Sequence, residues 1–245
     1  MKAMIFAAGL GTRMRPATDN LPKALIPIDG VPLLEIIIRQ LKCFGIKDII
    51  INIHYLADQI EAFLADNQNF DINIQISDER SLLLETGGAL QKASWFFDDD
   101  QPFLVCNTDI LSNIDLSQFL EQHKKNASIA TLAVQNRKSS RYLLFNNENQ
   151  LCGWMNTGQS KVKLSRLSDK ELKMRAFSAF QIINPSIFKY FPEKQSVFSI
   201  IDTYLLASEH NFISAFDHSA DQWIDVGTPE KISAAVNVLR SINIG

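Results

Sequence analysis

Short apolar runs alternate along the chain with segments whose apolar residues recur at helical spacing. Residues 3–8 form the first run and predict a strand that is buried on both faces. Residues 33–44 follow a period of about 3.6 residues, which predicts an amphipathic helix ending at Gly45. By the same criteria, strands are predicted at residues 47–53, 71–76, 102–106, 142–145, 150–155, 177–183 and 223–226, and helices at 57–64, 88–96, 197–208 and 229–242.

The alternation of strand and helix patterns holds to about residue 135 and predicts parallel β-α-β units. The expected fold class is therefore α/β, a Rossmann-like three-layer sandwich with a mainly parallel central sheet. Residues 160–173 are rich in Lys, Ser and Asp and are expected to form a mobile surface loop. We find no internal repeat and no interdomain linker, so a single domain over residues 1–245 is predicted.

The turn after the first strand, Gly9-Leu10-Gly11-Thr12-Arg13-Met14, has the composition of a phosphate-binding loop. Met14 stands where a dinucleotide fingerprint or a P-loop needs its next glycine, so both named motifs fail. A buried strand still leads into a glycine-bearing turn whose backbone amides can face an anion. Arg13, Arg15 and Lys23 place three cations nearby. The alternative is an ordinary turn with solvated arginines.

Composition narrows the classes of partner. The formal net charge of −3 gives no general basis for nucleic-acid binding, and no apolar run is long enough to span a membrane. Three widely spaced cysteines match neither a disulfide framework nor a zinc site. Lys2 and the apolar run after it imitate an export signal, but arginines follow at once and no cleavage site is convincing. A cytoplasmic location is expected.

The glycine turn and the segment after it closely resemble the signature of the sugar-phosphate nucleotidyltransferases. The resemblance is carried by Gly9-x-Gly11-Thr12-Arg13-Met14-x-Pro16-x-Thr18 and by Pro22-Lys23-Ala24-Leu25-Ile26-Pro27, and it continues over most of the chain. It implies an enzyme that joins a sugar 1-phosphate to a nucleoside triphosphate and releases pyrophosphate. It also implies a nucleotide-binding half, residues 1–135, and a sugar-binding and closing half, residues 136–245.

Asp109 and Asp225 each follow a predicted strand, where an Asp often serves only as a cap or turn residue. Their separation in the sequence does not show that they meet. The resemblance implies that they do, and that together they hold Mg²⁺ against the phosphates. A hard cation bound by few carboxylates and by substrate oxygens suits such a site.

The resemblance also assigns the remaining site residues. Gly9, Gly11, Thr12 and Arg13 would bind the triphosphate, and Arg13 and Lys23 would be catalytic. The loop Leu84-Glu85-Thr86-Gly87-Gly88 would read the base, although two glycines before a helix are more often a simple turn. Glu85, Gly87 and Gly88 are the nucleotide-binding residues expected there, and Asn107 would bond ribose or sugar hydroxyls.

Among short members of the family, the segments at 84–88, 177–188 and 223–228 are most similar to N-acetylmuramate 1-phosphate uridylyltransferases, which act in cell-wall recycling. Mannose-1-phosphate guanylyltransferases and glucose-1-phosphate thymidylyl- or uridylyltransferases are the alternatives. Thr108 replaces a common Gly, and a Glu-Lys-Pro sugar-contacting motif is missing from residues 151–175, where Lys161 and Lys163 are candidate substitutes.

Two rival classes remain on the sequence alone. An inactive nucleotide-binding regulatory subunit would have no need of Arg13, Lys23, Asp109 and Asp225 together. A nicotinamide-dependent oxidoreductase would need the glycine fingerprint that is absent here.

Overall fold

The computed structural model describes residues 1–167 and 171–245, which form two compact units. Unit 1 consists of residues 1–83, 105–114 and 221–245, and unit 2 of residues 84–104 and 115–220. The expected division at residue 135 into two functional halves stays a prediction. In the part of the chain that the structure describes, no helix has the length and apolar character required to cross a bilayer.

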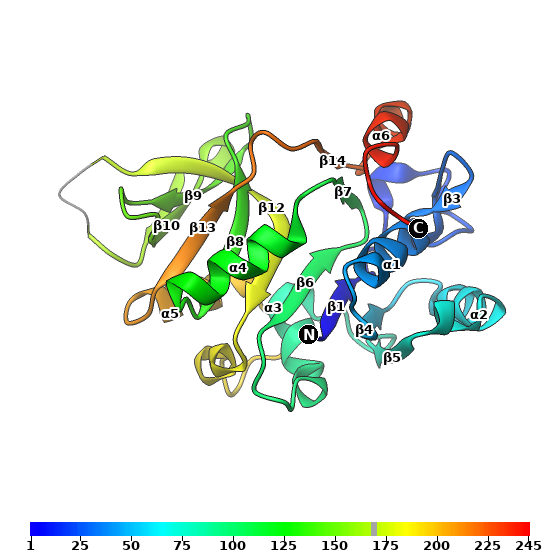
Figure 1. Cartoon of the computed structure of the whole chain (residues 1–245), viewed down its shortest axis with the longest axis horizontal. Helices are drawn as coiled ribbons and strands as arrows, with labels where there is room; N and C mark the ends of the chain where they lie inside the picture. Colours follow the sequence, from blue (N-terminus) through cyan, green and yellow to red (C-terminus); the bar gives the residue numbers. More distant parts are fainter. Residues whose placement is uncertain (168–170) are drawn as a thin grey trace. The chain divides into compact units, whose positions relative to one another are not determined.

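Unit 1 is built on a parallel sheet. β1 (Ala3–Phe6) pairs with β4 (Asp48–Ile53), and β4 pairs with β5 (Asn73–Asp78), all in parallel register (Figure 1). Residues 105–107 of β6 (Phe103–Asn107) lie on the other side of β1. This is the α/β arrangement that the alternating pattern predicts, because parallel neighbours require crossover connections.

The helices of unit 1 agree with their predicted positions. α1 (Leu33–Cys43) buries Leu34, Ile37, Ile38 and Leu41 completely, as the helical spacing predicts, and α2 covers Ala57–Asp66. The predicted closing helix is divided into the 3₁₀-helix η7 (Pro229–Lys231) and α6 (Ile232–Leu239).

Two small antiparallel sheets and three 3₁₀-helices complete unit 1. Each sheet has two strands: β2 (Pro27–Ile28) pairs with β3 (Val31–Pro32), and β7 (Ile110–Ser112) pairs with β14 (Trp223–Asp225). The 3₁₀-helices are η1 (Thr12–Met14), η2 (Lys23–Leu25) and η3 (Gln68–Asp71). α6 packs against β2, β7 and β14, so the last segment of the chain is fixed to the first and the middle ones.

Unit 2 contains a mostly antiparallel sheet. Its strands are β8 (Ala130–Gln135), β9 (Arg141–Phe145), β10 (Leu151–Asn156), β11 (Lys161–Leu164), β12 (Lys173–Ile183) and β13 (Ile213–Asp217). β12 pairs first with β9 and then with β8, and β13 pairs in parallel with β8. β11 contradicts the expectation that residues 160–173 are only a loop: Val162 and Leu164 alternate with lysines and pair with β10. Residues 168–170 of that predicted loop lie outside the described residues.

The helices of unit 2 are α3 (Glu85–Lys92), α4 (Leu116–Asn126) and α5 (Ile200–Ser208), with the 3₁₀-helices η4 (Ser94–Phe96), η5 (Thr157–Gln159) and η6 (Pro185–Tyr190). α3 begins three residues before the predicted start at Gly88. α5 begins at Ile200 rather than at residue 197, because Ser199 accepts a hydrogen bond from Ile201 N and so caps the helix.

Candidate functional site

The backbone conformation of the glycine turn after β1 is fixed by Gly11 and Thr18. Gly11 has φ of +65°, a backbone conformation that favours glycine, and Thr18 Oγ1 donates a 2.8 Å hydrogen bond to Gly11 O. A side chain at Gly11 would place Cβ only 2.9 Å from Thr18 Cγ2 and 3.2 Å from Lys23 Cβ. Among the described residues, the N–H groups of residues 10–12 have no hydrogen-bond acceptor, so they are available to an anion.

Lys23 lies beside this turn and forms an ion pair with Asp109. Its side chain is 11% exposed and that of Asp109 is 21% exposed, so the pair is partly shielded from water but open to a ligand. Thr108, the residue before Asp109, is held in place by two hydrogen bonds. Its N–H and its hydroxyl both donate to Phe6 O, at 3.1 and 3.0 Å. The Thr at position 108 therefore ties the end of β6 to the end of β1.

The antiparallel pair of β7 and β14 brings Asp225 to Asp109. Asp225 stands opposite Ile110 in the antiparallel register, and Val226 N donates a 2.8 Å hydrogen bond to Asp109 O. Lys231 Nζ lies 3.7 Å from Asp225 Oδ2, while Asp225 Oδ1 is buried with no hydrogen-bond partner among the described residues. Each of the two carboxylates thus has an ammonium neighbour, which limits their mutual repulsion.

The Arg13 side chain lies near Asp225. An ideal Cβ built on Gly227 would lie 2.9 Å from Arg13 Nη2 and 2.8 Å from Asp225 Oδ1, so all three groups are neighbours. Arg13 is exposed, and it has no hydrogen bond or ion pair within the described parts of the chain. Unit 1 therefore brings Gly11, Arg13, Lys23, Asp109 and Asp225 together around one space.

The other predicted nucleotide-binding residues of unit 1 lie in the turn after β1 and at the end of β6. Gly9 follows β1, and a side chain there would meet nothing within 4 Å; Thr12 opens η1. Asn107 is the last residue of β6, two positions before Asp109.

Glu85, Gly87 and Gly88 belong to unit 2, where they form the first turn of α3. A Cβ at Gly87 would lie 2.4 Å from the Phe198 ring, and one at Gly88 would lie 1.9 Å from Ser196 O. Both glycines are therefore required for packing, whatever else this turn does. Glu85 adopts φ of +58°, a strained conformation for a residue with a side chain and one that often occurs at functional loops.

Sequence reasoning missed three contributors to this site: Lys231, Gly227 and the anchoring role of Thr108. The only sequence signal for Lys231 and Gly227 is their position just after the predicted strand 223–226. The sequence does not indicate that this strand pairs with β7. Of the candidate substitutes for the missing sugar-contacting motif, Lys163 is paired with Asp202 of α5, and Lys161 lies at the exposed start of β11. Both lie in unit 2.

The donor set fits a hard divalent cation. Across the described residues there is no cluster of three or more His, Cys, Asp and Glu side chains that could hold a metal alone. Two carboxylates, one with a buried and unpartnered oxygen, suit Mg²⁺, which prefers oxygen ligands and usually completes its shell with water and substrate phosphates.

Comparison with known proteins places these features in a family. The profile described as "Nucleotidyl transferase" matches residues 2–241. The chain is 32% identical over 209 residues to UTP–glucose-1-phosphate uridylyltransferase of Synechocystis, covering 80% of this chain and 52% of the relative. It is 44% identical over 117 residues to N-acetylmuramate alpha-1-phosphate uridylyltransferase of Neisseria meningitidis, covering 48% of this chain and 50% of the relative. Mannose-1-phosphate guanyltransferase of Hypocrea jecorina is 29% identical over 94% of this chain and 62% of its own length. The chain thus spans 50% to 62% of the length of these three relatives.

Solved structures support the fold. HddC from Yersinia pseudotuberculosis, complexed with GMP-PN, superposes with a TM-score of 0.76 at 22% identity, over 96% of this chain and 98% of its own. A UDP-glucose pyrophosphorylase complexed with UDP-glucose gives a TM-score of 0.74 at 18% identity, over 98% and 97%. The predicted α/β class and the family resemblance are both confirmed: this chain belongs to the nucleotidyl transferase family.

Proposed function

We propose that this chain joins a sugar 1-phosphate to a nucleoside triphosphate, giving a nucleoside diphosphate sugar and pyrophosphate. The observation that carries the proposal is the convergence of Gly11, Arg13, Lys23, Asp109 and Asp225 in unit 1. Such a site holds cations, free amides and two carboxylates around one space, which is the composition needed to bring two phosphate esters together. The names of the relatives support the same reaction.

Charge neutralisation is the main task of the site, because both substrates are polyanions. The free N–H groups at residues 10–12 bind the triphosphate, and Arg13, which has no partner of its own among the described residues, holds the pyrophosphate end. Lys23 is positioned by Asp109 and donates to phosphate oxygens at the reacting centre. An oxygen of the sugar phosphate attacks the α-phosphorus, the bond from that phosphorus to the bridging oxygen breaks, and pyrophosphate leaves.

Asp109 and Asp225 are the residues that would hold Mg²⁺. When bound, the ion supplies positive charge against the phosphates. The orphaned Oδ1 of Asp225 supports this assignment, because a buried carboxylate oxygen without a donor is unfavourable unless a cation occupies the position.

The proposed substrates are UTP and an N-acetylmuramate-like sugar 1-phosphate. Support comes from the 44% identity over 117 residues to the N. meningitidis uridylyltransferase. In this assignment Glu85, Gly87 and Gly88 contact the base and Asn107 the ribose or sugar, and the product enters cell-wall recycling. The alternatives are mannose 1-phosphate with GTP, supported by the match over 94% of this chain, and glucose 1-phosphate with UTP or dTTP.

The test is pyrophosphate release measured with Mg²⁺ over a grid of four nucleoside triphosphates and several sugar 1-phosphates. Release that requires both substrates, with the nucleoside diphosphate sugar identified by mass spectrometry, is the expected result. Highest turnover with GTP and mannose 1-phosphate would replace the proposed substrates. Nucleotide binding without release over the whole grid would favour an inactive regulatory subunit instead.

A further inference from the structure

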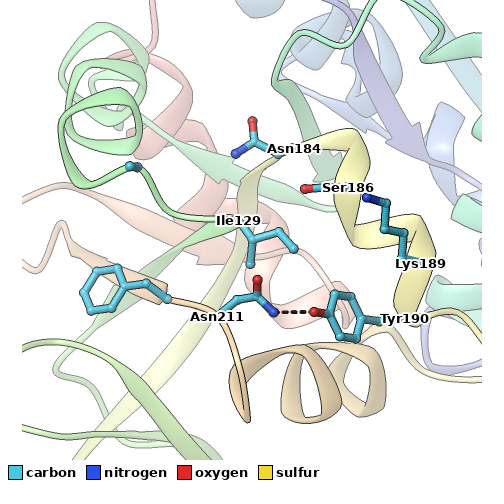
Figure 2. Close-up of a pocket in the computed structure, with 8 residues that line it drawn as sticks. Ile129, Asn184, Ser186, Lys189, Tyr190 and Asn211 are labelled. Carbon is cyan, nitrogen blue, oxygen red and sulfur yellow. Dashed lines mark hydrogen bonds between the residues drawn. The ribbon is translucent and has the colours of Figure 1, made fainter.

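A cavity of about 280 Å³ opens on unit 2 beside η6. Figure 2 shows Ile129 between Asn184 and Asn211, with Ser186, Lys189 and Tyr190 on η6. Five of the lining side chains are polar, and Ile129 and Phe212 add apolar surface. All of these residues belong to unit 2, so the cavity does not involve the site around Lys23.

The polar groups of this cavity keep unused hydrogen-bonding capacity. Within the residues that the structure describes, neither the Lys189 ammonium nor the Ser186 hydroxyl has a partner. Asn211 Nδ2 donates to Tyr190 Oη at 2.5 Å and to Ala207 O at 2.9 Å, which leaves its Oδ1 free to accept. The cavity thus offers one positive charge together with neutral donors and acceptors.

The wall behind the cavity is a fixed polar network. Asn184 Nδ2 donates to Ser128 O at 2.7 Å, and Asn184 Oδ1 lies 3.5 Å from His123 Nε2. His123 Nδ1 is 2.8 Å from Thr131 Oγ1. His123 and Thr131 are buried, so the Asn184 side chain is held by a rigid support.

We propose that this cavity binds a monosaccharide phosphate. Lys189 and Ser186 suit a phosphate group, because a single ammonium with a hydroxyl donor matches a small anion. Asn184, Asn211 and the Tyr190 hydroxyl suit sugar hydroxyls, which both donate and accept, and Ile129 offers an apolar surface to the sugar ring. The volume lies just below the usual range of about 300–1,000 Å³ for pockets that bind drug-sized ligands, so a single sugar fits this class better than a nucleotide sugar. This inference does not depend on the proposed function.

The probe is glucose 6-phosphate, titrated by calorimetry into the full chain. Its phosphate is not on the anomeric carbon, so it is not an acceptor in the proposed reaction. Lys189→Gln removes the charge from an exposed position, and Lys194→Gln makes the same change on an exposed lysine outside the cavity. Lys23→Ala separates this binding event from the site in unit 1.

We expect saturable binding that Lys189→Gln weakens tenfold or more, the loss expected when a charged hydrogen-bond donor is removed. Lys194→Gln and Lys23→Ala should bind as tightly as the unmodified chain. In carbon–proton spectra of the four histidines, the His123 signal should shift on titration and the His54 signal should not.

Three results would overturn the inference: no saturable binding, an equal loss in Lys189→Gln and Lys194→Gln, or loss of binding in Lys23→Ala. Glucose and inorganic phosphate are titrated as separate arms. Inorganic phosphate binding as tightly as glucose 6-phosphate would overturn the assignment of a sugar phosphate.

Discussion

Replacing Gly227 with alanine adds one methyl group where Asp225 and Arg13 already meet. The new Cβ would lie 2.8 Å from Asp225 Oδ1 and 2.9 Å from Arg13 Nη2, whereas ordinary contacts begin at 3.4 Å. The carboxylate oxygen must therefore retreat by roughly 0.6 Å and the guanidinium by roughly 0.5 Å, the differences between 3.4 Å and the two distances. The backbone of Gly227 is not in the left-handed region, so alanine adds no backbone strain.

Displacements of this size act on rate more than on stability. Misplacing a catalytic group by about 1 Å costs about 10²-fold in rate, so we expect Gly227→Ala to lose about 10- to 100-fold in turnover. Arg13 is exposed and can move aside, so the melting temperature should fall by only a few degrees. The matched control is Gly158→Ala, whose Cβ would meet its nearest neighbour at an ordinary 3.5 Å.

The assay is pyrophosphate release with the best substrate pair from the grid, at several Mg²⁺ concentrations, with thermal melting in parallel. Wild-type turnover in Gly227→Ala would refute the inference that Arg13 and Asp225 belong to the same catalytic site. Loss of turnover together with a large fall in melting temperature would refute the reasoning that the Arg13 side chain moves aside at little cost in stability.

Three other perturbations test the site and the fold. Lys23→Ala should lose about 10²–10³-fold in turnover with the fold retained, as for removal of one preorganised donor, and Lys47→Ala, an exposed lysine of unit 1, should not. Asp225→Asn should raise the Mg²⁺ concentration that gives half-maximal pyrophosphate release, because one anionic oxygen is lost. His218 should make unfolding pH-dependent: burial lowers its pKa from 6.5 to about 4. As the pH falls from 6.5 to 4, His218 becomes protonated in the unfolded chain but stays neutral in the folded chain. This difference removes about 3 kcal/mol from the free energy of unfolding.

Each of these predictions can fail. Near-full activity in Lys23→Ala would remove Lys23 from the mechanism, and an unaltered Mg²⁺ titration would count against a metal role for Asp225. For the histidine, urea unfolding is compared between pH 7 and 4.5 in the unmodified chain and in His218→Gln. The variant should show the shallower fall, and parallel curves would contradict the assignment.

In unit 1 the sequence predicts β1, β4, β5, α1 and α2, because each of these elements is marked by its own local pattern. β1 is a continuous apolar run, β4 carries four isoleucines, and α1 has four fully buried residues at helical spacing. α4 was not predicted, because its apolar positions are few; its signal was Asp115, which accepts hydrogen bonds from Ser117 N and Gln118 N and caps the helix. The sequence predicts a loop in place of β11, because lysines alternate with its two apolar residues.

The candidate site was predictable by residue type but not by position in space. Gly9, Gly11 and Lys23 are close in the sequence, and for this reason their proximity in the structure could be predicted. The meeting of Asp109 with Asp225 depends on the pairing of β14 with β7, a three-residue strand that the sequence pattern does not predict. Lys231 and Gly227 enter only through that pairing, so sequence reasoning could not find them.

Unit 1 is assembled from three separate stretches of chain, and Asp225 lies in the last of them. A ribosome must therefore make all of unit 2 before β14, which carries Asp225, can pair with β7 next to Asp109. Until then the growing polypeptide holds Lys23 and Asp109 but only one of the two acids. A nascent chain that is released before residue 225 therefore lacks one acid of the proposed Mg²⁺ site, and the proposed reaction would have to wait until synthesis has passed that residue.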